Sequence, residues 1–322
     1  MNRISLIIAC AIALCSCTAP TYRTASGEIW TTTYSVTYQS PTDLADSVAT
    51  VLEQVDISLS PFNPQSRLAA INAGTSAATD TLLRHMIRLS AHVNTLSYGR
   101  FDPTVAPLVN LWGFGYRNAR DIPTASAVDS ARRLVGIQRC RIQADTLVKG
   151  HPDMEFNFSA IANGYACDLV AQMLRRNGVS NYLVEIGGEI AASGLNSRGE
   201  QWHVQIDAPV PGPAHERLTV VTLTDGALAT SGNYRNFRQD TTGLSVWHTI
   251  DPLTGYPART SVLSATVRAP ECALADALAT ACMALPADSA IAMIQAIPSA
   301  ACLLVVAQSD TITLLTTPNF AL

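Results

Sequence analysis

The sequence predicts an α+β fold in which mixed, largely antiparallel sheets pack against helices. Short alternating apolar segments, typical of strands, follow one another closely, and a Gly-Gly pair joins two of them as a hairpin in residues 181–194. Other stretches carry apolar residues at about 3.6-residue spacing, which predicts amphipathic helices. Hydrophobic residues make up 48% of the 322-residue chain and charged residues 14%, so a sizeable core is buried.

The N-terminus has the pattern of an export signal. Residues 1–16 contain one arginine, an apolar run and then small residues, and the run is too short for a membrane-spanning helix. The sequence Leu-Cys-Ser-Cys that ends at Cys17 resembles the lipobox of bacterial lipoproteins, which implies cleavage before Cys17 and acylation of that cysteine. We therefore expect a signal peptide at 1–16, a lipidated tether at 17–27 and a folded domain at 28–322. An ordinary signal peptide with a fortuitous cysteine is the alternative.

Export with a lipid anchor implies an extracytoplasmic, periplasm-facing protein held at the inner or outer membrane. The net charge of −4 and the absence of a Lys/Arg-rich run exclude a nucleic-acid-binding surface. Five cysteines remain beyond Cys17, an odd number without metal-ligand spacing, so we expect buried free thiols.

The N-terminal half alternates between strand, helix and loop patterns. Residues 27–40, rich in Thr and Tyr, predict a strand, and 41–60 predict an amphipathic helix. Residues 60–74 carry two prolines and predict a loop, in which the ring of Phe62 either covers a flat ligand or packs into the core. A second helix follows in 79–99. Its two histidines lack a third ligand nearby and indicate polar surface positions rather than a zinc site.

The middle of the chain contains two segments that suit a binding site. Residues 98–115 are apolar but rich in Gly, Pro and Trp, which predicts a buried irregular segment that lines a site. Ser159 is typical of an N-cap, and the following apolar periodicity predicts a helix to about Arg176 and then a strand pair in 181–194. Small residues at this helix N-terminus suit either phosphate binding or close helix packing.

The C-terminal half predicts further strands and places a histidine beside a turn. Residues 199–209 and 217–237 are typical of consecutive strands, and Thr230 to Gly232 suit a plain turn or a phosphate contact. His248 and Asp251 flank the turn Pro-Leu-Thr-Gly, and a lone histidine there suits a structural hydrogen bond as well as proton transfer. Residues 288–320 predict a helix and a terminal hairpin around Ser309 and Asp310.

Residues 261–286 predict a strand, a break at Pro270 and a helix that carries Asp276 and Thr280. At i and i+4 these two side chains point from one helical face, with small alanines around them. Such a pair of hard oxygen donors suits Mg²⁺, which completes its octahedron with phosphate and water. The alternative is a solvated aspartate beside a threonine bonded to the helix backbone.

Six segments resemble, in the same order, the motifs of the FAD:protein FMN transferases, the ApbE family, over roughly residues 28 to 315. They are FDPTVAPLVNLWGFG, SAIANGYACDLVA, NYLVEIGGEI, ATSGNYRNF, HTIDPLTGYPA and ADALATA. The resemblance implies a fold related to the T-fold and Mg²⁺-dependent transfer of the FMN portion of FAD onto a Thr or Ser hydroxyl of an acceptor flavoprotein, with release of AMP. Lipoprotein members are common in the family.

The resemblance also implies roles for individual residues. Mg²⁺ ligands fall on the carbonyl of Ala160 and on Asp276 and Thr280, and His248 and Asp276 are the implied catalytic residues. Implied FAD contacts are Trp30, Phe62, Arg100, Phe101, Asp102, Asn157, Asn163, Thr249 and Ile250. The chain departs from the family at Trp30, where a Met is usual, at Asn157, where Asp is usual, and at Asn163, where Lys is usual. An Asn for Lys removes a positive charge near the ligand.

Two other functions are consistent with the same residues. Water as the acceptor would make the protein an FAD pyrophosphatase that yields FMN and AMP. Loss of chemistry would leave a flavin-binding lipoprotein, an alternative that the changes at Asn157 and Asn163 make conceivable.

Overall fold

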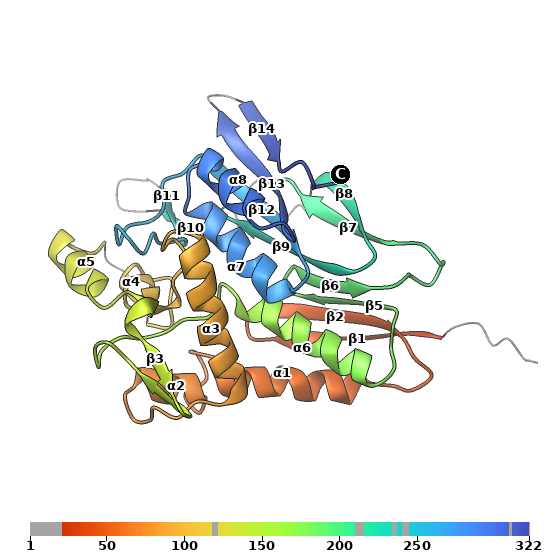
Figure 1. Ribbon diagram of the computed structural model, residues 1–322, viewed down its shortest axis with the longest axis horizontal. Helices are drawn as coiled ribbons and strands as arrows, with labels where there is room; N and C mark the ends of the chain where they lie inside the picture. The colour runs from red at the N-terminus through yellow and green to blue at the C-terminus, as the bar shows by residue number, and fades with distance from the viewer. Residues whose placement is uncertain are drawn as a thin grey trace, which may run out of the picture.

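The structure is a computed structural model that describes residues 21–117, 122–209, 216–233, 237–239, 245–308 and 311–321. Its centre is an eight-stranded sheet in which each neighbouring pair is antiparallel (Figure 1). In spatial order the strands are β1 (Tyr22–Ile29), β2 (Thr32–Gln39), β5 (Tyr182–Ile186), β6 (Glu189–Ser193), β9 (Gly226–Gly232), β12 (Val262–Ala269), β13 (Ala301–Gln308) and β14 (Thr311–Thr316). The predicted α+β class is confirmed.

Helices cover one face of this sheet, and the main hydrophobic core lies between the two layers. The longer helices are α1 (Ala45–Leu59), α3 (Thr81–Leu96), α6 (Ala162–Arg176), α7 (Cys272–Met283) and α8 (Ala287–Gln295). The shorter ones are α2 (Arg67–Asn72), η1 (Pro103–Val105), α4 (Ala106–Leu111), α5 (Ala125–Arg132) and η2 (Ile137–Arg139). Because α6 packs on β5 and β6 while α7 packs on β9 and β12, these two helices meet above the middle of the sheet.

A hairpin of β7 (Trp202–Asp207) and β8 (Arg217–Leu223) covers part of the opposite face. Buried residues of the hairpin, among them Val204 and Ile206, pack against Leu228 of β9 and Leu303 of β13. Two small hairpins, β3 (Arg141–Gln143) with β4 (Thr146–Val148) and β10 (Phe237–Gln239) with β11 (Ser245–Trp247), complete the described strands. The open face of the sheet is therefore only partly covered.

The first strand begins earlier than the sequence indicates. Residues 22–27, predicted as part of a tether, form most of β1, so that part of the prediction is wrong. Residues 27–40, predicted as one strand, reverse direction at Trp30, whose φ of 57° lies in the left-handed region, and continue as β2. Only Ala25 of β1 is buried, so this strand lacks the apolar alternation that identifies one in a sequence. Cys17 lies outside the described residues.

Several predicted loops contain short helices. The segment 60–74 includes α2, which begins after Ser66, and the Ser66 hydroxyl accepts a hydrogen bond from the Ala69 amide at 2.9 Å. The segment 98–115 includes η1 and α4. Thr230, Ser231 and Gly232 lie within β9 rather than in a turn, because they pair with β12. The predicted terminal hairpin is present as β13 and β14, although Ser309 and Asp310 lie outside the described residues.

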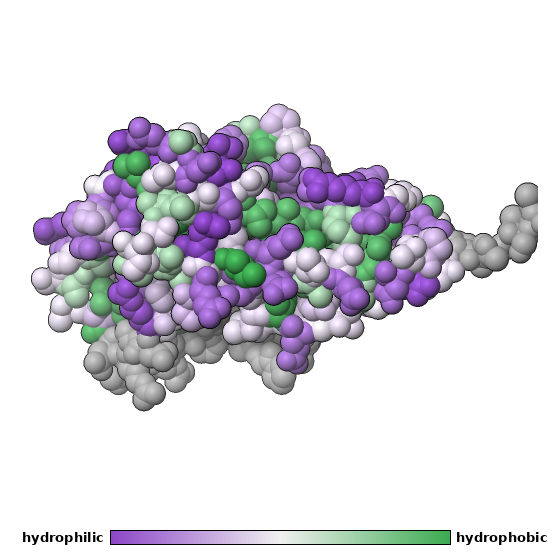
Figure 2. Space-filling model, turned by 90° about the horizontal axis from the view of Figure 1, so that it is seen from below, coloured by the Kyte–Doolittle hydropathy of each residue, from purple (hydrophilic) through white to green (hydrophobic). Residues whose placement is uncertain are grey.

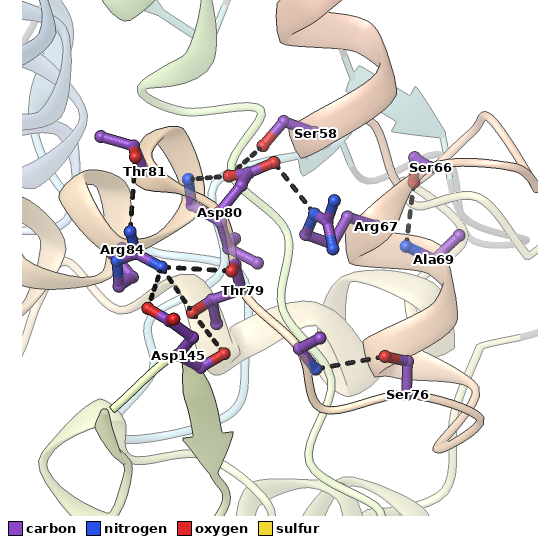
Figure 3. Close-up of polar contacts among 12 residues, drawn as sticks. Ser58, Ser66, Arg67, Ala69, Ser76, Thr79, Asp80, Thr81, Arg84 and Asp145 are labelled. Carbon is purple, nitrogen blue, oxygen red and sulfur yellow. Dashed lines mark hydrogen bonds and ion pairs between the residues drawn. The ribbon is translucent and has the colours of Figure 1, made fainter. Parts of the chain in front are cut away.

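One aspartate joins three helices on the side of the molecule away from β14. Asp80 is the N-cap of α3, and one of its carboxylate oxygens accepts from the Leu83 amide at 2.8 Å and from the Ser58 hydroxyl of α1 at 2.9 Å (Figure 3). Its other oxygen accepts from Nε of Arg67 in α2 at 3.0 Å. Close by, Arg84 donates to Asp145 at 2.8 Å. These bonds fix the ends of α1, α2 and α3 relative to one another.

The described surface is mixed in polarity. On the face that includes α1, hydrophobic residues are scattered among hydrophilic ones (Figure 2). Within the described ranges, no helix has the length and hydropathy needed to cross a bilayer. The five cysteines of these ranges are free thiols, as predicted, and four of them are buried.

Candidate active site

The site is built around the close contact of α6 with α7. A Cβ on Gly164 would lie 2.5 Å from the Cys272 carbonyl oxygen and 2.9 Å from Cβ of Asp276, so only glycine allows this approach. As a result the Gly164 amide donates to Asp276 Oδ2 at 3.1 Å. Asp276 is 5% exposed, and burial raises the pKa of its carboxyl to about 7. Among the described residues, no cationic side chain forms an ion pair with it.

Thr280 lies one helical turn beyond Asp276, as predicted. Its Oγ1 is 3.3 Å from the Ser231 hydroxyl of β9, so the Thr280 side chain faces the end of that strand. Ala160 lies in the turn that precedes α6, two residues before Ala162, the first residue of the helix. The described residues contain no group of three His, Cys, Asp or Glu side chains that would bind zinc, and the His85 and His92 side chains are exposed.

The residues present fit Mg²⁺. A buried carboxylate that accepts a hydrogen bond from a backbone amide, and that has no cationic side chain beside it among the described residues, needs a positive charge to compensate its burial. Mg²⁺ needs only one or two protein carboxylates, because phosphate and water complete its coordination. Asp276 and the Thr280 hydroxyl supply hard oxygen donors of this kind.

A second aspartate, which is partly buried and which the sequence pattern did not identify, holds the two helices together. Asp168 of α6 accepts hydrogen bonds from the amides of Cys272 and Ala273 at 2.8 and 2.9 Å. Burial raises its pKa to about 6. The sequence signal that identifies Asp168 is an acidic residue on the apolar side of a predicted helix. Asp168 caps the N-terminus of α7 and thereby positions Asp276.

Asn163 connects the start of α6 to the turn between β5 and β6. Its Nδ2 donates to Glu189 Oε2 at 3.1 Å, and Glu189 is buried. A Cβ on Gly187, which has a φ of 69°, would lie 2.7 Å from that nitrogen and 3.3 Å from the Thr32 hydroxyl. The predicted helix start at Ser159 is wrong: α6 begins at Ala162, because the Ser159 amide donates to Asn157 Oδ1 at 2.8 Å in a local turn.

Two aromatic side chains stand at the edge of this region. Trp30 Nε1 donates to Asp56 at 3.0 Å, and the other oxygen of Asp56 accepts from Asn63 at 2.6 Å, so one carboxylate of α1 holds both loops. Phe62 is 59% exposed and touches Tyr116 edge-to-face with ring centroids 6.2 Å apart. Its exposure removes the alternative that this ring packs into the core.

The remaining predicted contacts divide into accessible and internal groups. Arg100 is partly exposed and forms an ion pair with the buried Asp251. Phe101 is buried in the main core. The Asp102 carboxylate accepts from the Thr104 and Ile137 amides, both at 2.9 Å, and burial raises its pKa. These contacts indicate that Phe101 and Asp102 support the segment before η1, while Arg100 remains accessible to a ligand.

His248 follows β11 and is partly buried, with its ring 6.4 Å from the ring of Phe114. The next residues are internal: the Thr249 hydroxyl donates to Asn233 at 3.0 Å, and Ile250 is 6% exposed. Asp251 also accepts from the Leu253 amide at 2.9 Å. Both Asp251 oxygens are therefore engaged.

Comparisons with known proteins fit this arrangement. The model of the ApbE family matches residues 30–304. The FAD:protein FMN transferase of Vibrio cholerae serotype O1 is 37% identical over 282 residues, or 84% of each chain, and that of Haemophilus influenzae is 32% identical over 307 residues, or 89% of this chain and 87% of the relative. The solved flavin transferase ApbE from Vibrio cholerae superposes with a TM-score of 0.85 at 33% identity, covering 94% of this chain and 98% of that one. The Pseudomonas stutzeri flavinyl transferase ApbE in its apo form gives 0.83 at 31% identity, covering 93% and 95%.

Fold and relatives together define the class as flavin-transferase-like α+β proteins. Within that class, this chain belongs to the ApbE family.

Proposed function

We propose that this protein transfers the FMN moiety of FAD onto a Thr or Ser hydroxyl of an extracytoplasmic acceptor protein, with Mg²⁺, and releases AMP. The observation that carries the proposal is the buried Asp276 carboxylate, one helical turn from Thr280 and without an ion-pair partner among the described residues. It occurs in a chain whose relatives are named FAD:protein FMN transferases.

Asp276, Thr280 and the carbonyl of Ala160 would hold the metal. Bound there, Mg²⁺ would neutralise charge on the pyrophosphate of FAD and on the departing AMP. Asn163 supplies an amide rather than a cation nearby, so the metal would be the main positive charge at the phosphates. The exposed ring of Phe62 and the ring of Trp30 offer apolar surface for flavin or adenine, and Asp56 bonds to Trp30 and to Asn63, the neighbour of Phe62.

The reaction forms one bond and breaks another. The acceptor hydroxyl oxygen attacks the phosphorus of the FMN portion, and the phosphorus–oxygen bond to AMP breaks. His248 takes the hydroxyl proton, provided that its ring lies within about 3 Å of that oxygen in the complex. Asp251 is a poor alternative, because its carboxylate is held in an ion pair by Arg100.

One assay separates transfer from the two alternative functions. The protein is incubated with FAD, Mg²⁺ and a candidate acceptor domain, and the acceptor is then denatured. Flavin fluorescence that stays on the denatured acceptor supports transfer. Free FMN without labelled acceptor supports a pyrophosphatase, and FAD binding without either product supports a flavin-binding lipoprotein.

The membrane anchor is a separate part of the proposal. Cys17 would carry the acyl chains and hold the protein to the inner or outer membrane, facing its acceptor. A Cys17→Ala variant should move from the membrane fraction to the soluble periplasmic fraction. Mass spectrometry of the wild-type N-terminus should find an acylated Cys17, and an unmodified one would contradict the anchor.

A further inference from the structure

A groove lies on the face of the sheet opposite the helices. The groove has a volume of about 480 Å³ and runs between β7 and the open face of β2, β5 and β6. Ser35 and Glu185, which are cross-strand neighbours, belong to its floor, and Gly187 lies at one end. The volume is in the range of ligand-binding pockets. Neither Asp276 nor Thr280 lines it.

One wall of this groove is the edge of a strand. Five consecutive residues of β7, 203–207, line the groove, and no residue of β8 does. β7 pairs with β8 on its other side, and among the described residues it has no second neighbouring strand. An antiparallel strand with one neighbour presents backbone N–H and C=O groups along its outer edge, which an extended peptide can pair with.

The groove leads to the proposed reaction centre. Gly187 and Thr32 line its end, and a Cβ on Gly187 would lie 2.7 Å from the Asn163 amide nitrogen. The residue after Asn163 is Gly164, whose amide donates to Asp276. The path from groove to metal site is therefore a series of direct contacts across the β5–β6 turn.

We propose that this groove binds an extended segment of the acceptor protein, which pairs with the outer edge of β7 and directs the target Thr or Ser towards the β5–β6 turn. The proposal rests on the proposed transfer function, since it requires a protein acceptor. The six residues of β7 offer an edge of roughly 20 Å, at about 3.3 Å per residue. The carboxylates of Glu185 and Asp207 line the groove together with His203, which favours a neutral or basic segment over an acidic one.

The test uses the full-length protein and the acceptor domain that the wild type labels in the transfer assay. Ser35→Arg fills the groove from β2. Thr37→Arg is its matched control, because Thr37 lies two residues along the same strand and outside the groove. Ser35→Arg should raise the KM for the acceptor about ten-fold or more, whereas its KM for FAD should stay at the wild-type value. Thr37→Arg should match the wild type in both.

A second variant and a direct measurement complete the test. Gln205→Arg obstructs the groove from β7 and should reproduce the effect if Ser35→Arg does not fold, as judged by circular dichroism. Hydrogen exchange should show the amides of 202–207 gaining protection when the acceptor is added to the wild type.

Unchanged acceptor KM in both groove variants, or unchanged exchange in β7, overturns the groove proposal while the transfer function stands. If the wild type labels no acceptor domain, the transfer function fails first and the groove proposal falls with it.

Discussion

At the scale of single residues, the site depends on a few side chains whose partners lie far away in the chain. Asp276 is buried against the Gly164 amide, and Asp56 holds both Trp30 and Asn63. Arg100 compensates Asp251 across 151 positions. The predicted site residues divide into exposed ones, such as Phe62, and buried ones, such as Asp102.

Replacement of His248 tests the proposed proton transfer. His248→Asn removes the base but keeps a polar side chain of similar size, so flavin transfer should fall by about 10²-fold or more. FAD binding, followed by quenching of flavin fluorescence, should stay near the wild-type value. His92→Asn, an exposed histidine on α3, is the control and should transfer normally. Wild-type transfer rates in His248→Asn would exclude this histidine as the base.

Replacement of Asp102 tests its supporting role through pH. Desolvation raises the pKa of Asp102 in the folded protein above its ordinary value of 3.8. A raised pKa means that its contribution to stability is present below pH 3.8 and is lost as the pH rises through the folded pKa. In Asp102→Asn, the free energy of unfolding should therefore fall less steeply with rising pH than in the wild type. Urea denaturation at a series of pH values measures both slopes, and equal slopes would contradict the prediction.

At the scale of elements, helix ends decide how the helical layer is assembled. Asp168 of α6 caps α7, and Asp80 caps α3 while bonding to α1 and α2. Each of these carboxylates accepts hydrogen bonds from amides or side chains of another element, so the caps also link separate elements of the tertiary structure. The relative positions of α6 and α7, and with them the proposed metal site, follow from such links.

Loss of the Asp80 cap should destabilise the protein. Asp80→Ala removes acceptors for the Leu83 amide, the Ser58 hydroxyl and Arg67. The free energy of unfolding should fall by about 1–2 kcal/mol, measured by chemical denaturation. Asp153→Ala, at an exposed position, should change it by less than about 0.5 kcal/mol. Equal stability of the two variants would show that the Asp80 hydrogen bonds add no more to stability than the exposed Asp153 side chain does.

At the scale of the whole molecule, the two proposed sites lie on opposite faces of one sheet. The helical face holds the Asp276 and Thr280 pair, and the opposite face holds the groove beside β7. The two approach each other at the end of the sheet where the β1–β2 and β5–β6 turns lie, since Gly187 contacts both Thr32 and Asn163. In this arrangement FAD and an acceptor would reach one centre from different sides.

Metal binding should be visible in global stability. Mg²⁺ at about 100 times its Kd should stabilise the folded protein by roughly 2.7 kcal/mol, seen as a higher Tm than in EDTA. Asp276→Asn should lose this response, because it replaces the charged ligand by a neutral amide. Asp225→Asn, an exposed aspartate on the loop before β9, should retain it. A full Mg²⁺ response in Asp276→Asn would place the metal elsewhere.

Local pattern predicted much of the fold. The helices that became α1, α3 and α6 were recognisable because 3.6-residue periodicity reports burial of one face within a single segment. The β5–β6 hairpin was recognisable from its glycine pair. α2 is only six residues long, and β1 is mostly polar, so neither carries enough periodic signal.

By itself, the sequence determined the common direction of Asp276 and Thr280, because helical geometry places i and i+4 on one face wherever the helix lies. It also determined the family resemblance, through the order of six segments. Tertiary structure alone decided that Gly164 lets α6 approach α7, that Asp168 caps α7, that Arg100 meets Asp251, and that β7 borders a groove. These contacts join residues that are distant in the chain, and their existence depends on how whole elements pack rather than on any local pattern.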